Sequence, residues 1–124
     1  MTIASTKWED LKDLTLTQTR GGVTYTGKLL SVDRYLEICK EHNIFPIIEL
    51  KWASGINNND MSWFPKLYAL IQKHDMVDKA YILTSMQKSL EYVRTNYPAL
   101  KCQFLCYEVT EARYEWCKQW GINP

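Results

Sequence analysis

The strongest constraint on the fold is a repeated pattern, in which a short apolar run is followed by an amphipathic helical segment. Three such pairs occur in series, and a further amphipathic segment precedes the first. Strands separated by helices pair in parallel, because each helix carries the chain back to the start of the sheet. The sequence therefore predicts an α/β fold of parallel β/α units. The predicted strands are residues 44–50, 80–85 and 101–109, and the predicted helices are residues 31–42, 61–74, 87–97 and 111–121.

Residues at the ends of the predicted helices agree with this assignment. Ser31 stands at the expected N-cap of the first helix, and Asp60 or Ser62 can cap the second, which has Pro65 in its first turn. Gly121 follows the last helix as a C-cap, because glycine adopts the left-handed conformation at little cost. Helix is therefore the expected state of these segments.

The first thirty residues fit the pattern less well. Residues 6–16 predict a short helix or a turn, and residues 19–30, rich in Gly and Thr, predict an irregular connection. A chain of 124 residues with 46% hydrophobic residues can build one core of moderate size. We therefore expect a single domain over residues 1–124.

Charge and hydropathy exclude two classes of protein. Lys and Arg number 15 against 14 Asp and Glu, and no long run of like charges occurs, so we expect no nucleic-acid partner. No apolar run approaches the roughly 20 residues of a membrane-spanning helix, and the N-terminus lacks the pattern of a signal peptide. A cytoplasmic protein without a membrane span is expected.

The cysteines predict neither a metal centre nor a disulfide framework. The 4 cysteines contain no C-x-x-C pair, and His42 and His74 lie far from any zinc-type spacing. Cys39 and Cys117 fall on the apolar faces of predicted helices, where a free cysteine behaves as a small hydrophobic residue. We interpret the cysteines as structural thiols.

The first predicted strand ends in an acid and a base, Glu49 and Lys51. Side chains alternate along a strand, so these two share one face. The apolar residues beside them, Ile48 and Leu50, share the other face, which we expect beneath the helices. Glu49 and Lys51 would then lie at the carboxyl end of the strand, where α/β barrels bind ligands, and Ser85 ends the second strand in the same way. The alternative is an ion pair between Glu49 and Lys51 with no further role.

Several segments resemble the glycerophosphodiester phosphodiesterase family. The segment "LLSVDRYLEICKEHNIFPIIELK" resembles the family's central helix and the strand that ends in Glu-x-Lys. Upstream, "WEDLKDLTL" resembles the stretch before that helix. Downstream, "AYILTSMQKSLEYVRTNYP" resembles the next strand and helix, and "GINP" the turn after the following helix. The resemblance, from about Trp8 to Pro124, implies a partial (β/α)8 TIM-type barrel, of which this chain is the middle portion.

The resemblance also implies an activity, which is metal-dependent hydrolysis of a small-molecule phosphodiester, typically a glycerophosphodiester of lipid metabolism. Glu49 would be a ligand of a divalent metal, Mg²⁺ or Ca²⁺, and Lys51 would face the phosphate. Ser85 matches a serine of the family and would line the site. In such a reaction a hard cation neutralises the charge of the diester, while a base and an acid move the protons.

The family's two catalytic histidines have no counterpart in this sequence, so we assign no catalytic residue. The chain has no His-Arg pair and no Glu-x-Asp triplet at the expected upstream place. The pair His74 and Asp75 ends a predicted helix downstream of Glu49, and we interpret it as a surface coincidence. The sequence therefore resembles a fragment of the enzyme.

A second interpretation is a catalytically inactive interaction or assembly module derived from the barrel. The sequence has 8 tyrosines and 5 tryptophans, and such residues are enriched at interfaces. A partial barrel also leaves strand edges and an apolar sheet face uncovered. This interpretation predicts a homo-oligomer or pairing with a complementing fragment.

Overall fold

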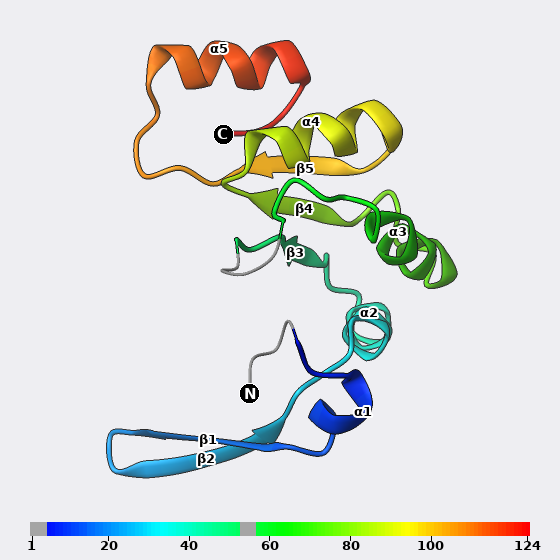
Figure 1. Cartoon of the computed structure of the whole chain (residues 1–124), viewed down its shortest axis with the longest axis vertical. Helices are drawn as coiled ribbons and strands as arrows, with labels where there is room; N and C mark the ends of the chain where they lie inside the picture. The colour runs from blue at the N-terminus through cyan, green and yellow to red at the C-terminus, as the bar shows by residue number, and fades with distance from the viewer. Residues whose placement is uncertain (1–4, 53–56) are drawn as a thin grey trace.

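The computed structural model describes residues 5–52 and 57–124, which form a two-stranded sheet, a three-stranded sheet and the helices around them. The strands are β1 (Thr15–Arg20), β2 (Val23–Lys28), β3 (Ile47–Glu49), β4 (Tyr81–Thr84) and β5 (Lys101–Phe104). The helices are α1 (Trp8–Leu11), α2 (Val32–Glu41), α3 (Phe64–Lys73), α4 (Gln87–Asn96) and α5 (Glu111–Trp120). Figure 1 shows the two-stranded sheet at one end of the molecule and α5 at the other. None of the helices in the described part of the chain has the length and apolarity that a membrane crossing requires.

The larger sheet is parallel, in the order β3-β4-β5, and this confirms the predicted series of β/α units. In its register Ile48 pairs with Ile82, and Ile82 pairs with Cys102. A single parallel bridge joins Gln103 to Asn123, so the residues after α5 lie alongside β5. Within the described residues the sheet stays open and does not close into a barrel.

All three of these strands are shorter than the sequence predicts, and β3 and β5 differ most. The predicted strand over 44–50 is reduced to β3, which begins directly after Pro46, a residue without an N–H to donate to a sheet. The predicted strand over 101–109 ends at Phe104. There the neighbouring strand also ends, and the N–H of Leu105 makes the last bond of the ladder, 3.0 Å from the carbonyl oxygen of Thr84. The residues that follow are therefore a loop.

The hydrophobic core lies between the parallel sheet and the helices that cover one of its faces (Figure 1). Phe64 on α3, Leu90 and Val93 on α4 and Ile82 on β4 are fully buried. Tyr97 follows α4 and packs against Phe64, with 5.0 Å between the ring centroids. Cys39 and Cys117 are buried free thiols on helices, as the sequence predicted.

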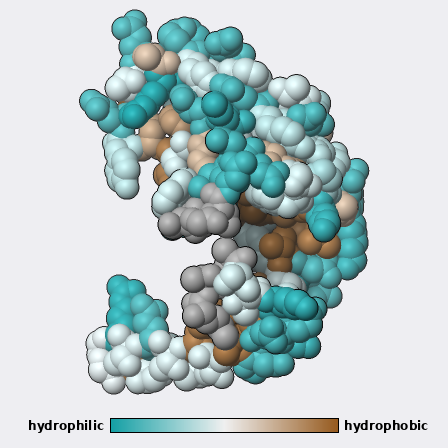
Figure 2. Space-filling view, in the orientation of Figure 1, coloured by the Kyte–Doolittle hydropathy of each residue, from teal (hydrophilic) through white to brown (hydrophobic). Residues whose placement is uncertain are grey.

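The other face of the sheet is uncovered. Ile47, which points to this face, is 53% exposed, whereas Ile82 on the helix-covered face is 0% exposed. The alternation predicted for β3 is confirmed, since Glu49 is exposed and Leu50 is buried. Ile47 is exposed because, among the described residues, no element covers this side of the sheet. Figure 2 shows a hollow between the hairpin and the remainder of the molecule, and hydrophobic surface is visible in this hollow.

The N-terminal region is a β-hairpin, which corrects the prediction of an irregular connection over residues 19–30. Strands β1 and β2 pair antiparallel from Thr15 opposite Lys28 to Arg20 opposite Val23. The turn consists of Gly21 and Gly22, with φ angles of 58° and 77°. A two-residue turn with both φ angles positive matches the twist of a hairpin, and glycine adopts these angles without strain. The predicted short helix within residues 6–16 is present as α1.

The helix ends are capped partly as the sequence predicts. The Ser31 hydroxyl accepts a hydrogen bond from the N–H of Arg34 at 3.2 Å, and Gly121 ends α5 with a φ of 62°. Neither Asp60 nor Ser62 caps α3, although Pro65 lies in its first turn. The N-cap is Trp63, which makes no capping bond with its side chain.

His74 is not the isolated surface residue that the sequence suggested. Its Nε2 atom lies 2.7 Å from Oδ1 of Asp33 on α2, and its side chain is only 12% exposed. Lys73 Nζ lies 2.9 Å from both oxygens of the same carboxylate. The hydrogen bonds from His74 and Lys73 lower the pKa of Asp33 below its ordinary value. These contacts hold α2 against α3, which is a structural role.

Candidate functional site

The three parallel strands end side by side, and the residues at their carboxyl ends line one cavity. This cavity, which we call the mouth cavity, has a volume of about 490 Å³. It gathers all three site residues predicted from the sequence, since Glu49 ends β3, Lys51 follows it and Ser85 follows β4. Its lining residues are Glu49, Leu50, Lys51, Trp52, Ser85, Phe104, Leu105, Cys106, Tyr107 and Arg113.

A buried threonine fixes the ends of β3 and β4 relative to each other. Thr84 is 0% exposed, and its hydroxyl donates a hydrogen bond to the carbonyl oxygen of Leu50 at 2.6 Å. The same hydroxyl accepts a bond from the N–H of Met86 at 3.1 Å. Lys51 follows Leu50 and Ser85 precedes Met86 in the sequence. The hydrogen bonds of Thr84 therefore fix the positions of both residues.

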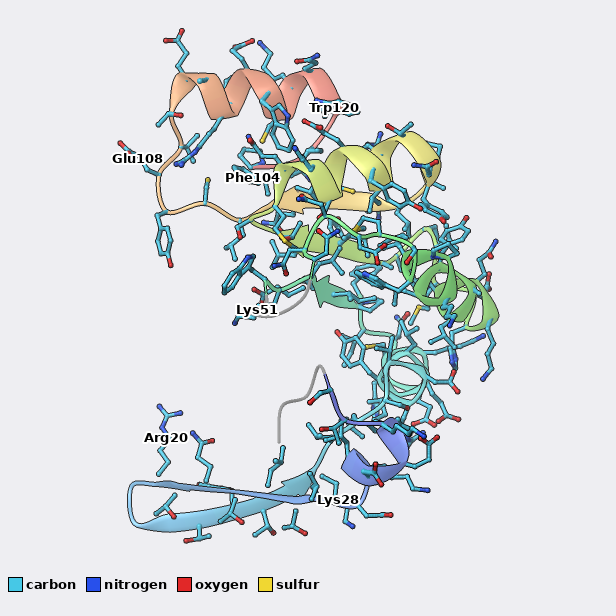
Figure 3. The ribbon with its side chains drawn as sticks, viewed as in Figure 1. Arg20, Lys28, Lys51, Phe104, Glu108 and Trp120 are labelled. Atoms are coloured by element: carbon cyan, nitrogen blue, oxygen red, sulfur yellow. The ribbon has the colours of Figure 1, made fainter. Side chains whose placement is uncertain are left out.

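Glu49 and Lys51 make a loose contact with each other. Lys51 Nζ lies 4.0 Å from Glu49 Oε1, and the two side chains are 81% and 40% exposed for Lys51 and Glu49, respectively. An ion pair of this length in such exposed surroundings contributes at most about 1 kcal/mol to stability. The stabilisation that this ion pair provides is therefore too small to account for two charged residues at this position. Figure 3 shows Lys51 on the open side of the molecule.

Arg113 is a residue of the mouth cavity that the sequence did not indicate. It lies in the first turn of α5, where its N–H donates to the side chain of the N-cap Thr110 at 3.3 Å. Its Nη1 atom donates to the carbonyl oxygen of Glu108 at 2.7 Å. The cavity thus has two cations and one carboxylate, with Trp52 and Tyr107 in its walls.

A second cavity, also of about 490 Å³, adjoins the first and shares Glu49 and Lys51 with it. It extends from the end of β3 toward the start of α3 and contains a further carboxylate, Asp60. The backbone N–H of Ser62 lies 2.9 Å from Oδ1 of Asp60, and this bond lowers the pKa of the carboxyl. Asp60 is thus charged near neutral pH and already holds a backbone partner.

The described residues do not form a complete site for a divalent metal. In residues 5–52 and 57–124, no group of three or more His, Cys, Asp or Glu side chains is placed to hold an ion. Glu49 supplies one carboxylate to the mouth cavity, whereas Ca²⁺ takes about six to eight oxygen ligands and Mg²⁺ about six. Glu49 therefore fits a metal as one ligand of several.

The two histidines lie away from the mouth cavity. His42 and His74 are the C-caps of α2 and α3. Each of these helices leads into the start of a strand, so its carboxyl end lies at the opposite end of the sheet from the mouth. Neither histidine lines the cavity, which therefore lacks an imidazole acid or base.

Parallel β/α units with a cavity at the carboxyl ends of the strands define a partial barrel of the (β/α)8 type. A crystal structure with a similar fold is that of a protein assigned as a glycerophosphodiester phosphodiesterase from Galdieria sulphuraria, with a TM-score of 0.70 and 18% sequence identity. The match covers 99% of this chain and 48% of that chain, so this chain spans about half the length of that protein. No family profile and no curated protein matches the sequence. The comparison confirms the fold that the resemblance implied.

Proposed function

We propose that residues 1–124 are one domain, the middle portion of a barrel that hydrolyses small-molecule phosphodiesters, and that the mouth cavity receives the phosphate. The proposal is carried by the convergence of Glu49, Lys51 and Ser85 on one cavity at the carboxyl ends of β3 and β4. Ser85 lies beside Glu49 and Lys51 because β3 and β4 pair in parallel. The structural similarity to a protein assigned as a glycerophosphodiester phosphodiesterase supports the same class of substrate.

The charged residues have separate roles in this proposal. Lys51 attracts the phosphate, because a cation near the cavity wall offsets the charge of the diester. Glu49 is one carboxylate ligand of a divalent metal, Mg²⁺ or Ca²⁺, which would supply charge neutralisation at the phosphate. Further ligands, and the acid and base of the reaction, would come from residues other than those described. We therefore expect binding without turnover from this chain.

The test is a titration of the chain with glycerophosphocholine, with and without Ca²⁺, followed by NMR of the Trp52 indole N–H. We expect Ca²⁺ to strengthen binding, because Glu49 would be one ligand of the ion, and the ion would supply positive charge for the phosphate. Glu49→Gln removes a metal ligand and should abolish the strengthening. No choline or glycerol phosphate should be released in the same samples.

The matched control is Glu9→Gln, which removes the same charge from α1, outside the cavity lining. It should leave the effect of Ca²⁺ unchanged. A Ca²⁺ effect that persists in Glu49→Gln would remove Glu49 from the metal site. Turnover that depends on metal and disappears in Glu49→Gln would contradict the expected inactivity and mean that this chain supplies its own acid and base.

A second candidate function is assembly, which the uncovered sheet face favours. Ile47 and Leu105 are 53% and 45% exposed at this face and its rim. In the described residues, the outer edge of β3 also has no strand paired with it. Exposed apolar surface beside an open strand edge promotes association with another β-structure. We propose that this face pairs with a second copy or with a complementing fragment.

Sedimentation velocity over a range of concentrations tests this candidate. We expect a species larger than the monomer at tens of micromolar, and Ile47→Lys should shift it toward monomer by placing a charge in the contact. Leu16→Lys, on the exposed hairpin, is the control for an added charge. A stable monomer at all concentrations with a cooperative thermal transition would count against assembly.

A further inference from the structure

We propose that Arg113 and Lys51 together form a two-cation subsite that binds a phosphate group without a metal. The inference rests on the proposed function for the class of ligand, and it adds a binding residue and a metal-independent mode of binding. Arg113 comes from α5 and Lys51 from the end of β3, and both line the mouth cavity. Two separate elements thus bring positive charge to one concave surface.

The charge of the cavity favours an anion. Its charged lining residues are Glu49, Lys51 and Arg113, which sum to a net charge of +1. Among the described residues Arg113 takes part in no ion pair, so no carboxylate compensates its charge. An uncompensated guanidinium in a concave site attracts anions from solution.

Arg113 also keeps hydrogen-bond donors that suit a phosphate. Its Nη1 bond to the Glu108 carbonyl oxygen, 2.7 Å long, anchors the side chain to the loop after β5. This bond uses one of the five donors of a guanidinium, so enough donors remain for a bidentate contact with two phosphate oxygens. The exposed indole of Trp52 lines the same cavity, so the NMR signal of its N–H should shift when a ligand binds there.

The experiment is a titration of the chain with inorganic phosphate in the presence of EDTA, followed by NMR of the Trp52 indole N–H. Arg113→Gln should weaken binding about tenfold, which is the loss expected for a charged hydrogen bond of about 1.4 kcal/mol. Lys51→Gln should weaken it to a similar extent. Arg20→Gln is the matched control, because Arg20 lies on the hairpin (Figure 3) and does not line the mouth cavity, and it should change the affinity less than about twofold.

Two further variants separate binding from structural roles. Arg113→Lys keeps the positive charge but loses the planar guanidinium donors that allow a bidentate contact. It should therefore recover part of the affinity lost in Arg113→Gln. Lys51 is 81% exposed, so Lys51→Gln leaves the fold intact and tests the subsite even if Arg113→Gln unfolds. Unchanged phosphate binding in Lys51→Gln, or in folded Arg113→Gln, would overturn the proposal. Phosphate that causes no saturable shift of the indole signal would also overturn it.

Glu49→Gln distinguishes this inference from the proposed function. In EDTA, removal of the negative charge should strengthen phosphate binding, because Glu49 repels the anion. With Ca²⁺, the same variant should weaken binding to glycerophosphocholine, because a metal ligand is lost. Weaker phosphate binding by Glu49→Gln in EDTA would overturn the two-cation subsite. A missing Ca²⁺ effect alone would overturn the metal role and leave the subsite intact.

Discussion

Leu50→Ala should lower the free energy of unfolding by about 2–5 kcal/mol, the usual cost of removing a large apolar side chain from a core. Leu50 directly follows β3, is 7% exposed and belongs to the core on the helix-covered side of the sheet. Glu49, the residue before it, faces the open side, and Glu49→Gln should change stability by less than about 1 kcal/mol because its ion pair is exposed. Urea titration of both variants measures the difference.

Ile47→Ala is the matched control for this prediction. Ile47 belongs to the same strand but is 53% exposed, so its truncation should cost less than about 1 kcal/mol. A large loss for Glu49→Gln together with a small loss for Leu50→Ala would mean that the faces of β3 are reversed. The assignment of Glu49 as a metal ligand would then have to be withdrawn.

Thr84→Val should cost about 2–4 kcal/mol of stability, although the two side chains have nearly the same shape. The substitution leaves two polar backbone groups without the Thr84 hydroxyl, namely the carbonyl oxygen of Leu50 and the N–H of Met86. Each buried group that loses its partner costs about 1–3 kcal/mol. Thermal or urea unfolding measures the total.

Thr84→Ser tests whether the hydroxyl is the cause. It keeps both hydrogen bonds and loses one methyl group, so it should cost only about 1 kcal/mol. We also expect the resonances of Lys51 and Ser85 to shift in Thr84→Val and to stay near their original positions in Thr84→Ser. Equal losses for the two variants would show that packing of the methyl group, and not the hydrogen bonds, holds the strand ends together.

The parallel units could be predicted from the sequence because their signals are local and repeated. Each helix has an apolar stripe, and each strand is a short run that the helices bury on one side. The face of β3 on which the Glu49 side chain lies could be predicted from the alternation of side chains alone. The position of Ser85 beside it followed from parallel pairing, which places the strand ends at one edge of the sheet.

Arg113 could not be placed from the sequence because the end of β5 was misjudged. With a strand to Val109, residues 105–109 would have been part of the sheet, and the start of α5 would have lain farther from Lys51. The strand instead ends at Phe104, and Leu105, Cys106 and Tyr107 belong to a loop that lines the mouth cavity before α5 begins. Strand ends depend on how long the neighbouring strand can continue to pair, and a single sequence does not contain that information.

The hairpin of β1 and β2 was missed for a different reason. Its residues are exposed on both faces, and the alternation of apolar residues with threonine, at Leu16 in β1 and at Val23 and Tyr25 in β2, is short. The remaining signal was the Gly21–Gly22 pair, which is typical of a tight hairpin turn. Hydrogen bonds between the two strands, and not burial, account for this element.

The exposure of that hairpin has a consequence for how the chain opens in solution. A two-stranded hairpin that buries no face is only marginally stable in water. Its opening exposes little additional apolar surface, so it can separate from the folded core at a small free-energy cost, as an independent unit of local unfolding. The backbone amides of β1 and β2 would then exchange with solvent much faster than those of β4. The same segment is the place where a protease would first cut the folded chain, and where a bound partner would add the most order.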